Sequence, residues 1–241
     1  MRNIKIMAHL VAGYPDEASC IQAIHALADA GVEIAELQIP FSDPTADGEV
    51  ITRASQKALD AGFRVRDIWR YIDTAKSLGF EEVHVMTYGN IVYRWGVRSF
   101  LEEMHSRGIT GVIVPDLPLE DDDRFYAAAR EIGIGALPVA VPNMTPQRKA
   151  LLKSTASEMV YAALRQGVTG RSTDITGESR EFLRSLDIPK IYAGFGISSR
   201  EQVLSLEQFA YAAVIGSHIT RALGSGRNAY ESVRNAVERC L

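Results

Sequence analysis

The feature that most constrains the fold is a regular alternation of short apolar runs with longer segments of helical periodicity. Eight runs rich in β-branched and other apolar residues recur along the 241 residues of the chain. They cover residues 4–12, 32–39, 82–88, 111–115, 135–141, 158–164, 190–195 and 210–216. Because most of these runs are apolar on both faces, they predict the strands of a parallel sheet that is covered by helices.

The segments between the runs carry apolar residues at helical spacing and often end in glycine. In the first of them, Ile21, Ile24 and Leu27 share one face before Gly31. A closing glycine is favoured at a helix C-terminus. The clearest such segments are residues 16–31, 65–79, 97–108 and 121–133.

Eight strand–helix units in a chain of this length predict an α/β fold, a (β/α)8 or TIM barrel, with residues 1–241 forming a single domain. An open doubly wound sheet is the alternative. No linker, low-complexity segment or charge run divides the chain.

Composition excludes several classes of protein. A hydrophobic fraction of 46%, a charged fraction of 23% and a net charge of −4 describe an ordinary globular protein and give no reason to expect nucleic acid. No apolar run reaches the roughly 18 residues of a membrane helix. The first apolar run lacks a small-residue cleavage site, so it is interpreted as a strand rather than a signal peptide. Two cysteines give no disulfide framework, which favours the cytoplasm.

The stretch AELQIPFSDPTADGEVI, residues 35–51, holds two candidate catalytic carboxylates. Glu36 lies within a predicted strand, and Asp47 lies on the loop that follows. Active sites of such barrels lie at the carboxyl ends of the strands. Burial there disfavours a charged carboxylate and suits it to move protons near neutral pH. The alternatives are an acid satisfied by backbone amides or an arginine, and ordinary Asp-Pro and Asp-Gly turn chemistry.

Glycine-rich segments follow the last three predicted strands, at residues 165–170, 193–198 and 215–219. Glycine allows a phosphate to approach the backbone closely, and amides at a helix N-terminus donate to it. The segment SHITRALG, residues 217–224, predicts a short helix of this kind. Three such loops after the late strands predict a phosphate site, with tight turns as the alternative.

The remaining side chains disfavour two other chemistries. The five histidines are scattered and form no HxH or HExxH pattern. His9 and His84 lie within predicted strands, where packing in the core is favoured over catalysis. Lys190 starts a predicted strand, at the wrong end for a Schiff base. What remains is metal-free acid–base chemistry by carboxylates on a phosphorylated substrate.

Residues 35–51 resemble the signature of the tryptophan synthase alpha chain family, close to ELG(I/V)PFSDPxADGPxI. Further marks of that family follow in order: AGYPD, VPDLPLE, GVTG, GFGIS and IGS. The resemblance implies a TIM-barrel carbon–carbon lyase of L-tryptophan biosynthesis. Such an enzyme cleaves indole-3-glycerol phosphate to indole and glyceraldehyde 3-phosphate, uses no metal or organic cofactor, and joins a beta chain in an α2β2 complex. No nucleic-acid or membrane partner is implied, and the location is cytoplasmic.

The resemblance also assigns residues. Glu36 matches the catalytic glutamate, and Asp47 matches the loop aspartate that accepts a hydrogen bond from the indole N–H. Gln38 stands where the family usually has glycine; it shares a strand face with Glu36 and could narrow the pocket or hydrogen-bond the glutamate. Glu49 stands where proline is usual. Substrate- and phosphate-binding positions are matched by Tyr161, Thr169, Gly170, Phe195, Gly196, Gly216 and Ser217.

Two alternative functions remain open. One is a stand-alone indole-3-glycerol phosphate lyase of another pathway. The other is a non-catalytic paralogue that binds a partner or ligand, against which the presence of both Glu36 and Asp47 argues.

Overall fold

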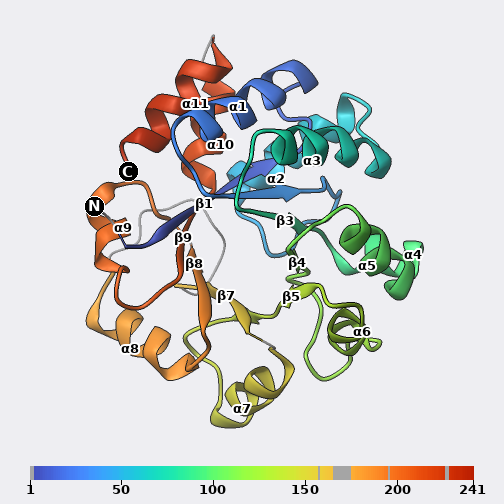
Figure 1. The fold of residues 1–241 in the computed structure, drawn as a ribbon, viewed down its shortest axis with the longest axis vertical. Helices are drawn as coiled ribbons and strands as arrows, with labels where there is room; N and C mark the ends of the chain where they lie inside the picture. The colour runs from blue at the N-terminus through green and yellow to red at the C-terminus, as the bar shows by residue number, and fades with distance from the viewer. Residues whose placement is uncertain (1–2, 157, 165–174, 195, 226–227) are drawn as a thin grey trace.

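Strands in the centre and helices outside them define the architecture (Figure 1). The computed structural model describes residues 3–156, 158–164, 175–194, 196–225 and 228–241. Within these residues the strands form one parallel sheet in the order β5-β4-β3-β2-β1-β9-β8-β7-β6. The strands are β1 (Lys5–Val11), β2 (Ile34–Gln38), β3 (Glu82–Met86), β4 (Gly111–Ile113), β5 (Gly135–Leu137), β6 (Val139–Ala140), β7 (Met159–Ala163), β8 (Lys190–Gly194) and β9 (Ala212–Ile215).

The first and last strands of the chain pair, and the two ends of the strand order, β5 and β6, are separated by a single residue, so the sheet forms a nearly closed barrel. β1 pairs with β2 on one side and with β9 on the other. Each of the eight predicted runs contains a strand, and the run 135–141 contains two short ones. The predicted barrel is therefore confirmed, and the alternative of an open doubly wound sheet is wrong.

Pro138 explains why the fifth predicted strand is divided. β5 pairs with β4, whereas β6 pairs with β7. Proline has no N–H to give to a ladder, so the regular pattern breaks at this residue. Its carbonyl still accepts a hydrogen bond of 3.0 Å from the backbone nitrogen of Tyr161. Residues 135–140 thus join the two halves of the sheet.

The helices surround the barrel (Figure 1). The predicted helical segments contain α1, α3, α5 and α6, and the glycines that follow them have φ of 69° to 87°, as the C-terminal glycines of helices do. No helix among the described residues is long and apolar enough to cross a membrane. The helices are α1 (Glu17–Asp29), α2 (Glu49–Asp60), η1 (Val65–Asp67), α3 (Ile68–Ser77), α4 (Gly89–Trp95), α5 (Val97–Ser106), α6 (Phe125–Ile132), α7 (Pro146–Thr155), α8 (Gly177–Leu186), α9 (Arg200–Ser205), α10 (Ser217–Ser225) and α11 (Ala229–Glu238).

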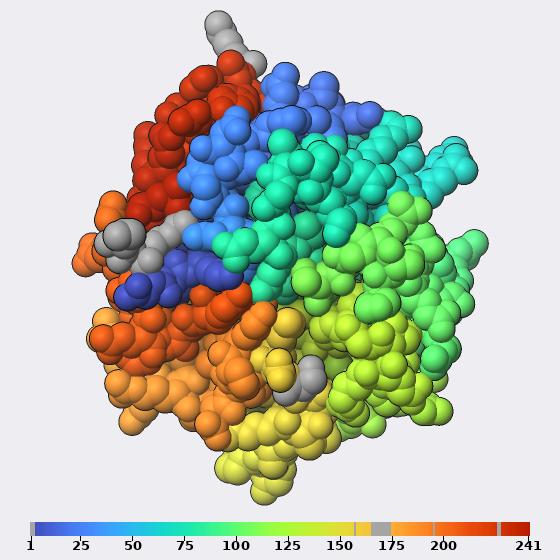
Figure 2. All heavy atoms as spheres, viewed as in Figure 1, coloured from blue at the N-terminus to red at the C-terminus, as the bar shows by residue number. Residues whose placement is uncertain are grey.

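Strand alternation divides the core into two parts. On β1, Ile6, Ala8 and Leu10 belong to the large cluster packed with the helices, while Met7 belongs to the cluster inside the barrel. Helix α1 packs against α11, so the chain's early and late segments lie together, as the blue and red surfaces of Figure 2 show. The inner cluster consists of Met7, Ile34, Met86, Tyr88, Ile113, Leu137, Tyr192, Ala212 and Val214.

The amino-terminal end of the barrel interior is polar. The buried carboxylate of Glu82 accepts hydrogen bonds from Lys190 Nζ at 3.0 Å, Tyr192 OH at 2.6 Å and Tyr211 OH at 2.8 Å. His84 Nε2 lies 3.0 Å from the same carboxylate. The inner apolar cluster thus lies between this network and the opposite, carboxyl end of the strands.

Candidate active site

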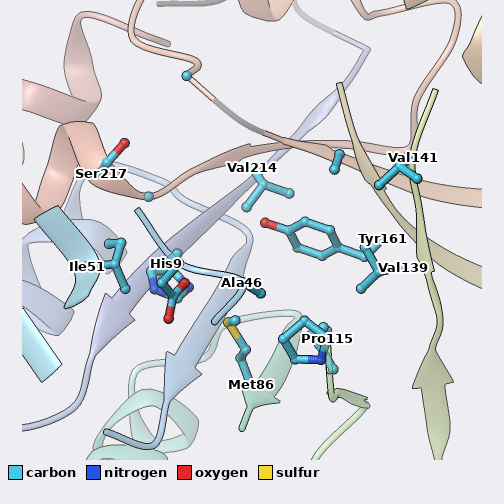
Figure 3. A pocket seen from close by; sticks show the side chains of 15 residues that line it. His9, Ala46, Ile51, Met86, Pro115, Val139, Val141, Tyr161, Val214 and Ser217 are labelled. Carbon is cyan, nitrogen blue, oxygen red and sulfur yellow. The ribbon is translucent and has the colours of Figure 1, made fainter. Parts of the chain in front are cut away.

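A cavity of about 250 Å³ opens at the carboxyl end of the strands (Figure 3). Its size is near the lower end for small-molecule sites, and its walls combine apolar side chains with a few polar groups, as such sites usually do. The apolar walls include Ile51, Met86, Ile113, Val139, Val141 and Val214. The polar lining includes His9, Asp47, Tyr161 and Ser217.

Glu36, in the middle of β2, is not among the residues that line this cavity but contacts His9, which is. The Glu36 side chain is 0% exposed, and neither carboxylate oxygen has a hydrogen-bond partner among the described residues. Its contact is with His9, the residue directly opposite on β1. His9 Nδ1 lies 3.2 Å from Glu36 Oε2, in the geometry of an ion pair rather than of a hydrogen bond.

His9 is predicted from the sequence to pack in the core rather than to act in catalysis. It is indeed buried, with 5% of its surface exposed, but it also lines the cavity. Burial alone would lower the pKa of His9, but attraction to Glu36 and Asp47 outweighs it and raises that pKa above its usual value. Strand alternation could have placed His9 on the inner face with Met7, but the contact with Glu36 depends on the pairing of two strands.

Asp47 reaches the cavity from the segment between β2 and α2. It is 8% exposed and accepts hydrogen bonds from Gln38 Nε2 at 2.7 Å and from Tyr88 OH at 2.9 Å. Burial raises the pKa of Asp47, only partly offset by His9 and the two donors. Gln38 is fully buried, and its amide donates to Asp47 rather than to Glu36.

Tyr88 fixes the segment that carries Asp47. Its hydroxyl donates to the carboxylate, and its ring stacks on Phe41 with centroids 5.1 Å apart and an interplanar angle of 19°. Tyr88 therefore contacts the segment between β2 and α2 at two residues, Phe41 and Asp47. Tyr88 is absent from the residues predicted from the sequence, because its partner Asp47 lies 41 residues away in the chain and no local pattern marks the contact.

Tyr161, predicted to bind substrate, projects from β7 into the cavity across from His9 (Figure 3). Burial and the nearby carboxylates Glu36 and Asp47 raise its pKa well above the usual value, so the phenol keeps its proton. Gly194 makes room for it, since a Cβ at that position would lie 3.1 Å from the Tyr161 hydroxyl oxygen and 3.0 Å from Val214 Cβ.

The predicted phosphate residues that the structure describes also meet at the cavity. Gly216 joins β9 to α10, Ser217 is the first residue of that helix, and Gly196 follows β8 with φ of 78°. The helix predicted at residues 217–224 is confirmed. The first N–H groups of a helix lack intrahelical partners and carry a partial positive charge, so this junction can hold an anion.

Three predicted residues, Thr169, Gly170 and Phe195, lie outside the described part of the chain. Within the described part, no three or more His, Cys, Asp or Glu side chains are grouped so that they could hold a metal ion. The proton-carrying groups identified at this end of the barrel are Glu36, Asp47 and His9.

Comparison with known sequences identifies the family. The sequence model described as tryptophan synthase alpha chain matches residues 2–240. The tryptophan synthase alpha chain of Syntrophotalea carbinolica is 36% identical over 229 residues, which cover 93% of this chain and 90% of that relative. The alpha chain of Mycobacterium avium is 36% identical over 225 residues, which cover 92% of this chain and 82% of that relative.

Solved structures give the same result. Tryptophan synthase of Mycobacterium tuberculosis superposes with a TM-score of 0.88 at 32% identity, covering 99% of this chain and 91% of that one. A chain of the tryptophan synthase complex of Pyrococcus furiosus gives 0.87 at 33% identity, covering 99% and 98%. Sequence and fold agree over nearly the whole length, and the chain therefore belongs to the tryptophan synthase alpha chain family.

Proposed function

We propose that the chain cleaves indole-3-glycerol phosphate to indole and glyceraldehyde 3-phosphate through its own carboxylates. The observation that carries this proposal is that Asp47 lines one largely apolar cavity at the carboxyl end of the barrel, while Glu36 lies directly behind it in contact with the lining residue His9. An apolar cavity suits an indole ring, and two acids in different surroundings can take different parts in one reaction.

The cleavage needs one proton added and one removed. Carbon 3 of the indole is protonated, the bond from this carbon to the glycerol chain breaks, and a proton leaves a glycerol hydroxyl as the aldehyde forms. Glu36 donates the proton to carbon 3 and accepts the proton from the glycerol hydroxyl. Asp47 accepts a hydrogen bond from the indole N–H, and this interaction strengthens as the ring gains positive charge. The reaction assigned to these residues needs no reactant other than the substrate.

The phosphate of the substrate is expected at the start of α10. Gly216 and Ser217 present backbone amides there, and Gly196 lies in the same cavity wall. Thr169, Gly170 and Phe195 complete the proposed set on the strength of their match to the family pattern.

Pairing with a tryptophan synthase beta chain is part of the proposal. The Pyrococcus furiosus relative is described as part of an α2β2 complex. Family membership supports the same assembly here, with residues 1–241 acting as one domain in the cytoplasm. The alternative is a lyase that acts alone.

The deciding experiment is an assay of indole release from indole-3-glycerol phosphate by the pure protein, with and without a beta chain. Stimulation by the beta chain supports the α2β2 assembly, and equal activity without it supports the stand-alone lyase.

Glu36→Gln should lower kcat by roughly 10²–10⁴-fold, the usual contribution of a general acid–base group. Glu158→Gln, at an exposed glutamate beside the start of β7, is the matched control. If no indole is released either with or without the beta chain, the proposed reaction is refuted.

A further inference from the structure

The mechanism above leaves one buried titratable side chain at the cavity without a function. His9 lies across the β1–β2 pairing from Glu36, with its Nδ1 3.2 Å from the Glu36 carboxylate. Its other ring nitrogen, Nε2, has no hydrogen-bond partner among the described residues. A buried polar atom without a partner is unusual enough to require an explanation.

We propose that His9 is a positioning residue for Glu36, and that the imidazole and the carboxylate act as one acid–base unit in the cleavage. This inference rests on the proposed lyase function. It adds a positively charged positioning residue to a reaction otherwise assigned to carboxylates alone.

The backbone places the two side chains against each other. Paired strands lie roughly 4.8 Å apart, so residues directly opposite each other on one face are neighbours. Glu36 has no hydrogen bond of its own to fix the plane of its carboxylate. The described neighbour that can orient this carboxylate is His9, at 3.2 Å. Gly216 lies next to the His9 side chain, since a Cβ at that position would be 3.4 Å from His9 Cβ, in ordinary van der Waals contact.

The charges around His9 favour a protonated imidazole. Glu36 faces it from β2 and Asp47 from the segment after β2, and both attract a protonated imidazole. Ser217 from α10 and Tyr161 from β7 line the same cavity and are uncharged there. On β3, His84 is the register partner of Glu36, and its Nε2 is engaged by Glu82. His9 is therefore the histidine whose ring nitrogen directly contacts Glu36.

The pairing of His9 with Glu36 explains how Glu36 can first donate a proton and then accept one. Glu36 in its acid form gives its proton to carbon 3 of the indole and becomes a carboxylate. His9, protonated at Nδ1, stabilises that carboxylate while the carbon–carbon bond breaks. The carboxylate then takes the glycerol hydroxyl proton and returns to the acid form. His9 ends the cycle with the charge with which it began, so the protons balance.

The first test does not depend on activity. In protein carrying ¹⁵N-labelled histidine, NMR titration should show His9 keeping its proton to higher pH than it does in Glu36→Gln. The exposed His25 serves as the internal reference, and its NMR signals should be the same in both proteins. If the His9 titration is the same in the parent and in Glu36→Gln, the pairing is refuted, whether or not the protein is a lyase.

The second test measures kinetics. His9→Phe keeps a ring but removes the nitrogens, and should lower kcat by roughly tenfold or more while changing KM less, below the full effect of a direct acid–base group. His9→Asn offers an amide near the position of Nδ1 that cannot titrate. It should restore part of kcat but alter the pH profile, and the control His25→Asn should match the parent.

The outcomes separate the two proposals. An active parent whose pH profile is unchanged by His9→Phe would overturn the assignment of His9 while leaving the lyase function intact. An inactive parent would refute the lyase function and with it any part for His9 in the cleavage, while the NMR titration still decides the ion pair. If His9→Phe fails to fold, the NMR titration of Glu36→Gln and the His9→Asn kinetics decide the question.

Discussion

Asp47 is a residue at which function and stability are expected to conflict. Burial raises the pKa of its carboxyl above the usual 3.8, so the folded state binds more protons there than the unfolded state does. Stability contributed by this group is therefore present at low pH and is lost as the pH rises through the folded pKa. At neutral pH the ionised Asp47 destabilises the fold.

We therefore predict that Asp47→Asn is more stable than the parent at pH 7 but impaired as a lyase. Thermal unfolding should show Tm raised by a few degrees, since a change of about 1 kcal/mol shifts Tm by roughly 2–4 °C in a chain of this size. The difference should shrink towards pH 4. Asp43→Asn, at an exposed aspartate in the same segment, is the control and should leave Tm unchanged. A lower Tm for Asp47→Asn at pH 7 would contradict this reading.

Gln38 orients Asp47, which leads to a second prediction for single residues. Gln38→Gly would restore the residue usual in the family, but Gln38 is fully buried, so glycine would also open a cavity. Gln38→Met keeps most of the volume and removes the donor to Asp47. Losing a hydrogen bond to a charged group costs about 1.5–3 kcal/mol, so kcat/KM should fall by roughly tenfold or more. The acid limb of the pH profile should also move to higher pH, because this donor lowers the pKa of Asp47. A profile that overlays the parent between pH 5 and 9 would show that the contact has no catalytic effect.

At the scale of elements, the junction of β9 and α10 is the part best suited to hold the substrate phosphate. We predict that Ser217→Asp, which adds a negative charge at the N-terminus of α10, weakens binding of glycerol phosphate by roughly tenfold or more, equivalent to 1.4 kcal/mol of repulsion. Calorimetric titration measures this directly. Ser225→Asp adds the same charge at the exposed far end of α10 and should bind as the parent does. Unchanged affinity in Ser217→Asp would place the phosphate elsewhere.

The elements were predictable from the sequence because their signals are local. Apolar runs located all eight strand positions, and closing glycines located the ends of four helices. The break at Pro138 was missed because the run 135–141 was interpreted as continuous, although a proline in a strand marks a point without a ladder donor.

The site was predictable only in part. Strand ends and glycine loops led to Asp47 and Ser217, and the resemblance to the family led to Tyr161; all three line the cavity. The contacts of His9 with Glu36 and of Tyr88 with Asp47 join residues far apart in sequence. Such contacts depend on strand register and on the path of a loop, which no single segment encodes.

At the scale of the whole molecule, the two ends of the barrel have different chemistry. The cavity with Asp47 lies at the carboxyl end, whereas Glu82 organises a hydrogen-bonded network at the amino-terminal end. In barrels of this kind the first end carries catalysis and the second carries stability. A single substitution at Glu82 can therefore test whether the two properties separate.

We predict that Glu82→Gln strongly destabilises the protein but leaves its kinetics unchanged below the unfolding temperature. Burial would raise the pKa of Glu82, but hydrogen bonds from His84, Tyr192, Tyr211 and Lys190 outweigh it and hold that pKa well below the usual 4.5. Stability from this carboxylate is therefore present above pH 4.5 and is lost as the pH falls towards the folded pKa. Removing the charge from a buried pair costs about 3–5 kcal/mol, so urea unfolding at pH 7 should show a large loss. The gap between parent and variant should narrow at pH 3.

The neighbouring Glu81 provides the matched control. Glu81→Gln breaks an exposed ion pair with Lys5 and should cost less than about 1 kcal/mol, because solvent screens such pairs. If Glu82→Gln proved as stable as Glu81→Gln, the network would not support the fold. If instead kcat fell in the folded Glu82→Gln protein, the two ends would be coupled through the barrel interior, and the adjacent His84, the register partner of Glu36 on β3, would be the physical connection to examine.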